Sequence, residues 1–407
     1  MAIEWGVMMD QKIFPKGFQG TGLNCSIKKE KRDLAVIFTE FDANVAVVYT
    51  NNILKAAPLQ ITQKHLANQE TAKAIIINSG IANAAMGEQG RNDAEAVSIF
   101  MAEKYQIAVN DIIVASTGVI GMPLPVKKIQ NGILESKALM KPLNESHELI
   151  ANAIMTTDTV AKESYKTLQI NNQMIRFWGI AKGSGMIHPN MSTMLGFICT
   201  DANITTPLLQ EALLESTNES FNMISVDGDT STNDMVAVLA NGQAGNDEIC
   251  DKSTEAYQIF KSALKEICQS LAKQIVADGE GATKMFEVQV KGSHSKNDAK
   301  MIARAVVSSS LVKAAIFGKD ANWGRIACAA GYSGASFDPN QLDIYIDDLI
   351  VAKNGQGIIF DETMALEKLS KKEISICIDL HQGNEDATAW GCDLTYDYVT
   401  INADYRS

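Results

Sequence analysis

Apolar residues in the first half of the chain follow patterns that predict alternating strands and helices. Residues 74–77 form a continuous, mainly β-branched run that stops at the polar triplet 78–80, as a buried strand does where it enters a turn. Residues 112–114 repeat this pattern. Between the two runs, Asn92 or Asp93 can cap a helix whose apolar positions recur at helical spacing. The order strand, helix, strand indicates α and β elements packed in layers.

The second half mixes long helical patterns with strands that have one buried face. Thr206 followed by Pro207 is typical of a helix start, because proline at the first helical position gives up no needed donor. Apolar and polar residues alternate in the predicted strands, which favours antiparallel pairing and an α+β fold over a doubly wound parallel sheet. The further predicted elements are a helix over 254–277, a strand over 286–290, a helix over 301–317, a hairpin turn at Asn354-Gly355 and a strand over 374–380.

The length of 407 residues exceeds the usual size of one hydrophobic core. We therefore expect two domains, each with α/β layers and a mixed sheet, and an active site at their interface, where small molecules often bind. No flexible linker or internal repeat marks the boundary.

Composition and charge narrow the function classes. The formal net charge of −12 argues against sequence-independent nucleic-acid binding, which needs clustered lysine and arginine. Neither a signal peptide nor a long apolar span is evident, so we expect a cytoplasmic protein without membrane contact. Seven scattered cysteines form no CxxC pair and five histidines form no HExxH motif, so we expect no metal site.

The segment 181–195 is the strongest candidate for chemistry. Two glycines and a proline precede Ser192 and Thr193, and the apolar run 195–199 follows at once. A core strand beginning at Met194 would place Thr193 at its rim, where a nucleophile is useful. From these residues alone, a glycine-rich surface turn remains the more common explanation. A phosphate-binding loop is excluded, because no GxxxxGK[ST] occurs and Lys182 precedes the glycines.

The sequence from Lys182 to Leu195, KGSGMIHPNMSTML, resembles the self-cleavage segment of the ornithine acetyltransferase family. Ser192 stands where that family usually has alanine, and Ile81 stands where a polar asparagine is usual. Similar segments extend over nearly the whole chain: Phe14-Pro-Lys-Gly-Phe18, Asn78-Ser-Gly80, Ser116-Thr-Gly-Val-Ile-Gly121, Met155-Thr-Thr-Asp-Thr159, Asp227-Gly-Asp-Thr-Ser-Thr-Asn-Asp234, Asp278-Gly-Glu-Gly-Ala-Thr-Lys284 and Asn402-Ala-Asp-Tyr405.

The resemblance implies a self-processing acetyltransferase of arginine biosynthesis with a fold like that of the aminopeptidase DmpA. Cleavage between Ser192 and Thr193 would give an α piece, residues 1–192, and a β piece, residues 193–407. Thr193 would then carry acetyl from N2-acetyl-L-ornithine to L-glutamate. A threonine hydroxyl needs a neighbouring base, and the α-amine that cleavage frees can serve as that base.

The same resemblance assigns the remaining site residues, partners and cofactors. Thr117 and Gly118 would stabilise the oxyanion. Without the resemblance, the triplet Ser-Thr-Gly is more simply explained as an ordinary turn at the end of a strand. The pieces are expected to associate two and two, with no cofactor; acetyl-CoA is left open as a second acetyl donor. Substrate contacts are implied for Thr156 or its neighbour Thr157, and for Lys182, Thr193, Glu280, Asn402 and Ser407.

Two alternatives stay open at this level. A self-processing aminopeptidase or amidase of related fold would use water in place of glutamate as the acceptor. A non-catalytic binding or scaffold protein with a glycine-rich loop would remain one intact chain.

Overall fold

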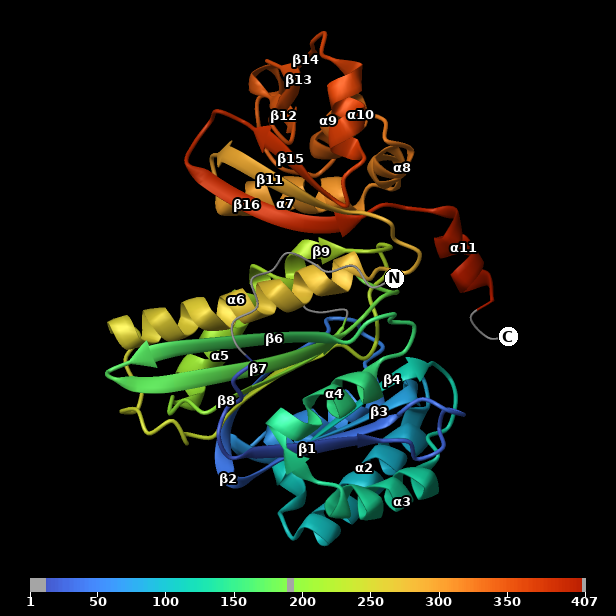
Figure 1. Cartoon of the computed structure of the whole chain (residues 1–407), viewed down its shortest axis with the longest axis vertical. Helices are drawn as coiled ribbons and strands as arrows, with labels where there is room; N and C mark the ends of the chain where they lie inside the picture. Colours follow the sequence, from blue (N-terminus) through green and yellow to red (C-terminus); the bar gives the residue numbers. More distant parts are fainter. Residues whose placement is uncertain (1–11, 189–193, 405–407) are drawn as a thin grey trace. The chain divides into compact units, whose positions relative to one another are not determined.

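The computed structural model describes residues 12–188 and 194–404, which form two compact units (Figure 1). Of these residues, the first unit holds 12–183, 194–218 and 230–271, and the second holds 184–188, 219–229 and 272–404. Each unit is built around its own mixed β-sheet with helices packed on it. The predicted α+β class with two layered domains is therefore confirmed.

The sheet of the first unit has nine strands in the order β4-β3-β2-β10-β8-β7-β6, with β1 paired to β2 and β5 paired to β1. The pairs β3–β4 and β8–β10 are parallel, and the other pairs are antiparallel. Its strands are β1 Phe18–Leu23, β2 Leu34–Tyr49, β3 Thr71–Ile81, β4 Ile112–Val119, β5 Lys141–Pro142, β6 Lys162–Ile170, β7 Gln173–Lys182, β8 Leu195–Thr200 and β10 Met235–Ala240.

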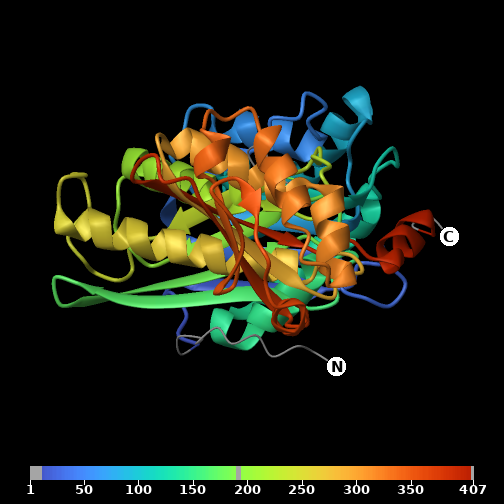
Figure 2. The same ribbon diagram turned by 90° about the horizontal axis from the view of Figure 1, so that it is seen from above.

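Both faces of this sheet are covered, so its central strands read as continuous apolar runs. Ile75 and Ile77 pack with α4, whereas Ala74 and Ile76 pack with α2 and α3 on the opposite face. Figure 1 shows α4 on one face of the sheet and α2 and α3 on the other, and Figure 2 shows α6 (yellow) beside the green strands β6 and β7. The helices are α1 Ala57–Leu66, α2 Gly87–Tyr105, α3 Val126–Ala138, α4 Leu143–Ile154, α5 Thr206–Asn218 and most of α6, Glu255–Ala277.

The sheet of the second unit has seven strands in the order β14-β13-β12-β15-β11-β16-β9. Strand β11 lies between a parallel and an antiparallel neighbour. Its strands are β9 Ile224–Ser225, β11 Met285–Ser293, β12 Asp343–Ile346, β13 Leu349–Lys353, β14 Gln356–Gly357, β15 Glu373–Asp379 and β16 Glu385–Cys392, and its helices are α7 Lys296–Ser308, α8 Ser310–Gly318, α9 Trp323–Gly331, α10 Glu362–Leu369 and α11 Tyr396–Ala403.

Most predicted elements are present, and two differ. The strands predicted at 74–77, 112–114, 286–290 and 374–380 are β3, β4, β11 and β15; the predicted helix from Thr206 and the helix over 254–277 are α5 and α6; and the hairpin turn at Asn354-Gly355 joins β13 to β14. The helix expected from Asn92 or Asp93 instead begins at Gly87, without a side-chain cap that could mark it. The helix predicted over 301–317 is two helices, because Ser309 has an extended backbone and its hydroxyl caps α8 by accepting the Val312 N–H.

The length and composition of the helices in the described ranges 12–188 and 194–404 bear on membrane crossing. No single helix there is both long and apolar enough to cross a bilayer. The helices α7 and α8 reach that length and composition only together, and a 57° bend separates them.

Candidate active site

The predicted oxyanion residues lie at the ends of the parallel strands β3 and β4. Ser79 pairs with Thr117, and Gly80 pairs with Gly118, where the register becomes irregular. Gly118 has a φ of +131°, and a Cβ atom there would lie 2.2 Å from the Gly80 carbonyl carbon. Only glycine fits both this backbone conformation and this approach. Irregular pairing of this kind is frequent beside active sites, because it turns backbone groups out of the ladder.

A network of side-chain amides holds this end of β4 in place. The Ser116 hydroxyl donates to Asn78 Oδ1 at 2.5 Å. Asn233 Nδ2 donates to the carbonyl oxygens of Ser116 at 2.8 Å and Ala82 at 2.6 Å. All of these groups are buried, so the loss of one partner would leave an unsatisfied polar atom. The backbone around Thr117 is consequently rigid.

The loop after α4 carries Thr156 and is fixed by a buried carboxylate. Asp158 accepts the Thr156 N–H at 2.9 Å, the Gly183 N–H at 2.8 Å and the Lys162 ammonium at 2.6 Å. Burial by itself would raise the pKa of Asp158, but the ammonium groups of Lys162 and Lys182 hold that pKa well below its ordinary value. Asp158 thus remains ionised and joins the Thr156 loop to the end of β7.

Lys182 ends β7 and lies opposite Leu195, the first residue of β8. The preceding Met194 accepts the Met235 N–H through its carbonyl oxygen at 3.0 Å, which aligns the starts of β8 and β10. Asp234 is 2% exposed at this edge, and burial raises its pKa well above the ordinary value. The predicted nucleophile Thr193 and the cleavage-site residue Ser192 lie outside the described residues.

Two predicted substrate contacts of the second unit touch each other. Asn402 Nδ2 donates to the Glu280 carboxylate at 2.8 Å, and the Glu280 N–H donates to the Ser184 carbonyl oxygen at 3.0 Å. A Cβ atom on Gly185 would lie 2.3 Å from this carboxylate, so the glycine makes room for Glu280. Ser407, the last predicted contact, lies outside the described residues.

Within the second unit, Asp227 holds the residues that precede the predicted cleavage site. Its carboxylate accepts the backbone N–H groups of Met186 at 2.6 Å and Ile187 at 2.8 Å, and the Tyr398 hydroxyl at 3.3 Å. Burial and the Asp227 charge raise the pKa of Tyr398 above its ordinary value. The segment that leads to the predicted cleavage site is therefore held by charge-assisted hydrogen bonds.

Several residues that organise these sites carry no role in the sequence prediction. Asp158 and the segment containing Asn233 belong to matched motifs, but motif letters do not say which side chains are buried or paired. Lys162 is fully buried against Asp158, although lysine is normally a surface residue. Lys28, whose ammonium group donates to Ser79 Oγ at 2.6 Å, lies outside every matched motif. Finding these residues requires the tertiary contacts.

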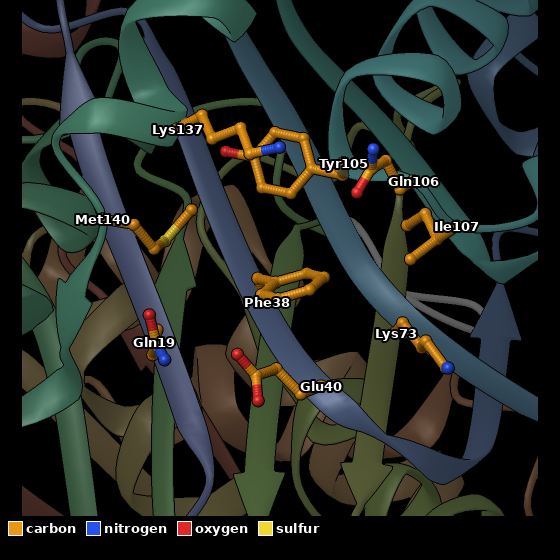
Figure 3. Close-up of a pocket in the computed structure, with 9 residues that line it drawn as sticks. All are labelled: Gln19, Phe38, Glu40, Lys73, Tyr105, Gln106, Ile107, Lys137 and Met140. Atoms are coloured by element: carbon orange, nitrogen blue, oxygen red, sulfur yellow. The ribbon is translucent and has the colours of Figure 1, made fainter.

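A surface cavity of the first unit is lined by none of those predicted site residues that the structure describes (Figure 3). It has a volume of about 400 Å³, and the rings of Phe38 and Tyr105 in it are 5.3 Å apart. Lys137 Nζ already donates to the Lys104 carbonyl oxygen at 2.7 Å. The lining residues are Gln19, Phe38, Glu40, Lys73, Tyr105, Gln106, Ile107, Lys137 and Met140.

The site combines the glycine-shaped ends of β3 and β4, the buried Asp158 carboxylate, and Lys182 opposite the start of β8. Such an arrangement suits an enzyme that stabilises a developing oxyanion. Residues 19–407 match the model of the ArgJ family. The chain is 49% identical to the arginine biosynthesis bifunctional protein ArgJ of Thermotoga neapolitana over 97% of this chain and 99% of that protein. For the ArgJ protein of Geobacillus kaustophilus the identity is 47%, over 97% and 96%.

Solved structures of ArgJ and ornithine acetyltransferase proteins are also similar to this chain. A crystal structure of the bifunctional protein ArgJ from Bacillus halodurans matches with 50% identity and a TM-score of 0.49, covering 50% of this chain and 96% of that chain. The ornithine acetyltransferase of Mycobacterium tuberculosis, solved with ornithine, matches with 33% identity and a TM-score of 0.39, covering 44% and 94%.

The chain belongs to the ArgJ family. This membership confirms the resemblance noted in the sequence, and with it the predicted class of activity, acetyl transfer in arginine biosynthesis.

Proposed function

We propose that this protein cuts its own chain before Thr193 and then transfers acetyl from N2-acetyl-L-ornithine to L-glutamate through an acetyl-Thr193 intermediate. The observation that carries the proposal is the glycine-only backbone of Gly118 at the paired ends of β3 and β4, next to Thr117. Fixed backbone donors at a strand end are what acyl transfer requires.

The self-cleavage follows from threonine chemistry. The Thr193 hydroxyl attacks the Ser192 carbonyl carbon, and the Ser192 acyl group moves from the Thr193 nitrogen to the Thr193 side-chain oxygen. The resulting ester is hydrolysed by water, which leaves a carboxylate on Ser192 and a free α-amine on Thr193. The anchoring of Met186 and Ile187 by Asp227 supports this step, because it fixes the chain before the cleavage site.

The new amine then serves as the base for catalysis. An α-amine has a pKa of about 8, so a useful fraction is neutral near neutral pH, whereas an amide nitrogen is not basic. It takes the Thr193 proton as the hydroxyl attacks acetylornithine, and Thr117 and Gly118 stabilise the oxyanion. Ornithine leaves with a proton, and the glutamate amine attacks the acetyl ester. One amide is broken and an equivalent one is made, so the exchange needs no ATP and no metal.

The substrate contacts are proposed from charge and position. Lys182 pairs with the α-carboxylate that acetylornithine and glutamate share, close to the start of β8. Thr156 or Thr157 binds from the loop that Asp158 fixes. Glu280 accepts from a substrate amino group; Asn402 orients this carboxylate and contacts the substrate, as does Ser407.

Acetyl-CoA is proposed as a second donor, by which the enzyme would acetylate glutamate directly. The bifunctional naming of the relatives supports this part of the proposal. We further propose that two α and two β pieces assemble and act in the cytoplasm, without a bound cofactor. Glutamate acetylation with acetyl-CoA as sole donor tests the second activity.

The decisive experiment compares Thr193→Ala with Ser192→Ala. Thr193→Ala is expected to stay one intact chain and to form no acetyl-enzyme by mass spectrometry, because the nucleophile is lost. Ser192→Ala is expected to be cut normally, since alanine is the usual residue of the family at this position. A Thr193→Ala protein that is cut or acetylated would refute the proposal. Ornithine release that is equally fast without glutamate would indicate an amidase.

A further inference from the structure

Lys28 lies in the connection between β1 and β2, and its backbone is held firmly there. The buried Asp33 carboxylate accepts the N–H groups of Cys25 at 2.6 Å and Lys28 at 2.8 Å. Asn24 Nδ2 donates to the Lys28 carbonyl oxygen at 3.1 Å. The Asp33 carboxylate therefore fixes the backbone from which the Lys28 side chain extends.

The Lys28 ammonium group uses all its donors within the protein. It donates to Ser79 Oγ at 2.6 Å, to the Met155 carbonyl oxygen at 2.6 Å and to the Arg32 carbonyl oxygen at 3.2 Å. A lysine ammonium has three N–H groups, and three acceptors are present. No proton remains for a substrate carboxylate, so Lys28 acts on the protein and not on the substrate.

One side of Lys28 faces the ends of β3 and β4, where the predicted oxyanion residues lie. A Cβ atom on Gly80 would lie 3.5 Å from Lys28 Cγ and 3.7 Å from Lys28 Cε, so the lysine stem packs over this glycine. Gly80 pairs with Gly118. Ser79, which accepts from Lys28, pairs with Thr117 and donates to the Ala153 carbonyl oxygen at 2.6 Å.

The other side of Lys28 holds the loop of Thr156. The Met155 carbonyl belongs to the peptide that enters Thr156, and the Thr156 N–H of the same peptide donates to Asp158. The two polar groups of this peptide are thus held from opposite sides, one by a cation and one by an anion. Charge-assisted hydrogen bonds are shorter and stronger than neutral ones.

We propose that Lys28 is a positioning residue that sets the distance between the oxyanion donors at Thr117 and Gly118 and the substrate loop at Thr156. The proposal rests on the roles that the proposed function gives to those three residues. Misplacement of such groups by about 1 Å can cost roughly a hundredfold in rate. Lys28 would therefore affect the chemical step more than substrate affinity.

The protonation of Lys28 gives this role a distinct signature. Burial lowers the pKa of Lys28 to about 8. Among the charges around it, Asp33 and Asp158 favour the charged form, whereas Lys31 and Lys182 disfavour it. The neutral amine has only two N–H groups for three acceptors. Activity should accordingly fall as the pH rises through about 8, whereas the Thr193 α-amine must lose its proton and gives a rising limb.

The test compares Lys28→Met, Lys28→Arg and the exposed neighbour Lys29→Met as control, with acetylornithine and glutamate as substrates. Lys28→Met is expected to lower kcat about tenfold to a hundredfold with KM within about threefold of wild type. Lys28→Arg should restore part of kcat and move the falling limb above about pH 10, because guanidinium does not titrate there. Lys29→Met should match wild type throughout.

The inference fails if Lys28→Met keeps wild-type kcat, or if Lys28→Arg keeps a falling limb near pH 8. Should Lys28→Met fail to fold, the pH profile of Lys28→Arg alone decides, since a purely structural lysine would not shift that limb. The proposed function fails separately, when Thr193→Ala remains active. If Thr193→Ala is inactive and Lys28→Met behaves like wild type, only the role of Lys28 is overturned.

Discussion

Gly118 and Gly121 lie three residues apart and both have a positive φ, +131° and +78°, but their surroundings differ. A side chain at Gly118 would collide with the Gly80 backbone, whereas no atom of residues 12–188 or 194–404 lies within 4 Å of the Cβ position of Gly121. The two glycines therefore differ in what a substitution introduces: backbone strain at Gly121, and strain together with a collision at Gly118. They form a matched pair for testing the oxyanion site.

We predict that Gly118→Ala lowers the rate of ornithine release about a hundredfold or more, because it displaces a backbone donor. It should also lower the melting temperature, since strain and collision add. Gly121→Ala should cost only about 1 to 3 kcal/mol of strain and leave kcat within a few-fold. Steady-state kinetics and thermal unfolding of the two variants check this. Equal kcat values for both variants would contradict it.

At this scale the family resemblance predicts residues for substrate contact, but it does not mark the buried residues that hold them in place. Glu280 and Asn402, both implied by the family resemblance, touch in the structure. Lys28 and Lys162 escaped notice, because lysine is abundant on surfaces and nothing local marks a buried one. Lys28 has partners on other elements, and the partner of Lys162 lies in a loop whose burial the sequence does not show. Only the fold therefore reveals these two lysines.

Among the elements, the loop between α4 and β6 is joined to β6 by a buried ion pair. The side chains of Asp158 and Lys162 are both fully buried, and their charged atoms are 2.6 Å apart. Breaking such a pair leaves an uncompensated buried charge, which typically costs about 3 to 5 kcal/mol. On the same strand β6, Lys166 pairs with Glu266 at 2.9 Å, but both side chains are partly exposed. An exposed pair contributes only about 0 to 1 kcal/mol.

We predict that Lys162→Met destabilises the protein by about 3 to 5 kcal/mol at neutral pH and that Lys166→Met is nearly neutral. The folded-state pKa of Asp158 lies below its unfolded value, so its stabilisation is present above about pH 4 and declines as the pH falls further. Lys162→Met should weaken this acid dependence. Denaturant unfolding from neutral to acidic pH measures both effects, and equal losses for the two lysine variants would refute the argument.

Element prediction succeeded where local pattern and tertiary burial agree. Helices α5 and α6 have a clear proline start or a long apolar face, and both were predicted. The α7–α8 break was missed, because apolar residues continue across Ser309 while its backbone becomes extended. The irregular register at Gly80 was also beyond sequence patterns, since it arises from pairing between strands.

For the molecule as a whole, the predicted cut lies in the sequence between two paired strands of one sheet, so both pieces contribute strands to that sheet. Within the first unit, β7 precedes the cut and β8 follows it, and six residue pairs join them. Strand β10, also after the cut, has six pairs with β2. One apolar core contains Trp178 from before the cut and Phe197 from after it. Separating the pieces would expose this core and break both ladders.

We therefore predict that the cut protein elutes as one species in native gel filtration and separates into two pieces only in denaturant. Residues 1–192 expressed alone should be insoluble or unfolded, and residues 193–407 expressed alone should lack the folded sheet of the first unit, because each piece leaves the strands of the shared sheet unpaired. Mixing the two pieces during refolding should restore β-structure by circular dichroism, and Thr193→Ala provides the uncut reference. Pieces that part on a column without denaturant would show that the ladders β7–β8 and β2–β10 do not hold the cut chain together.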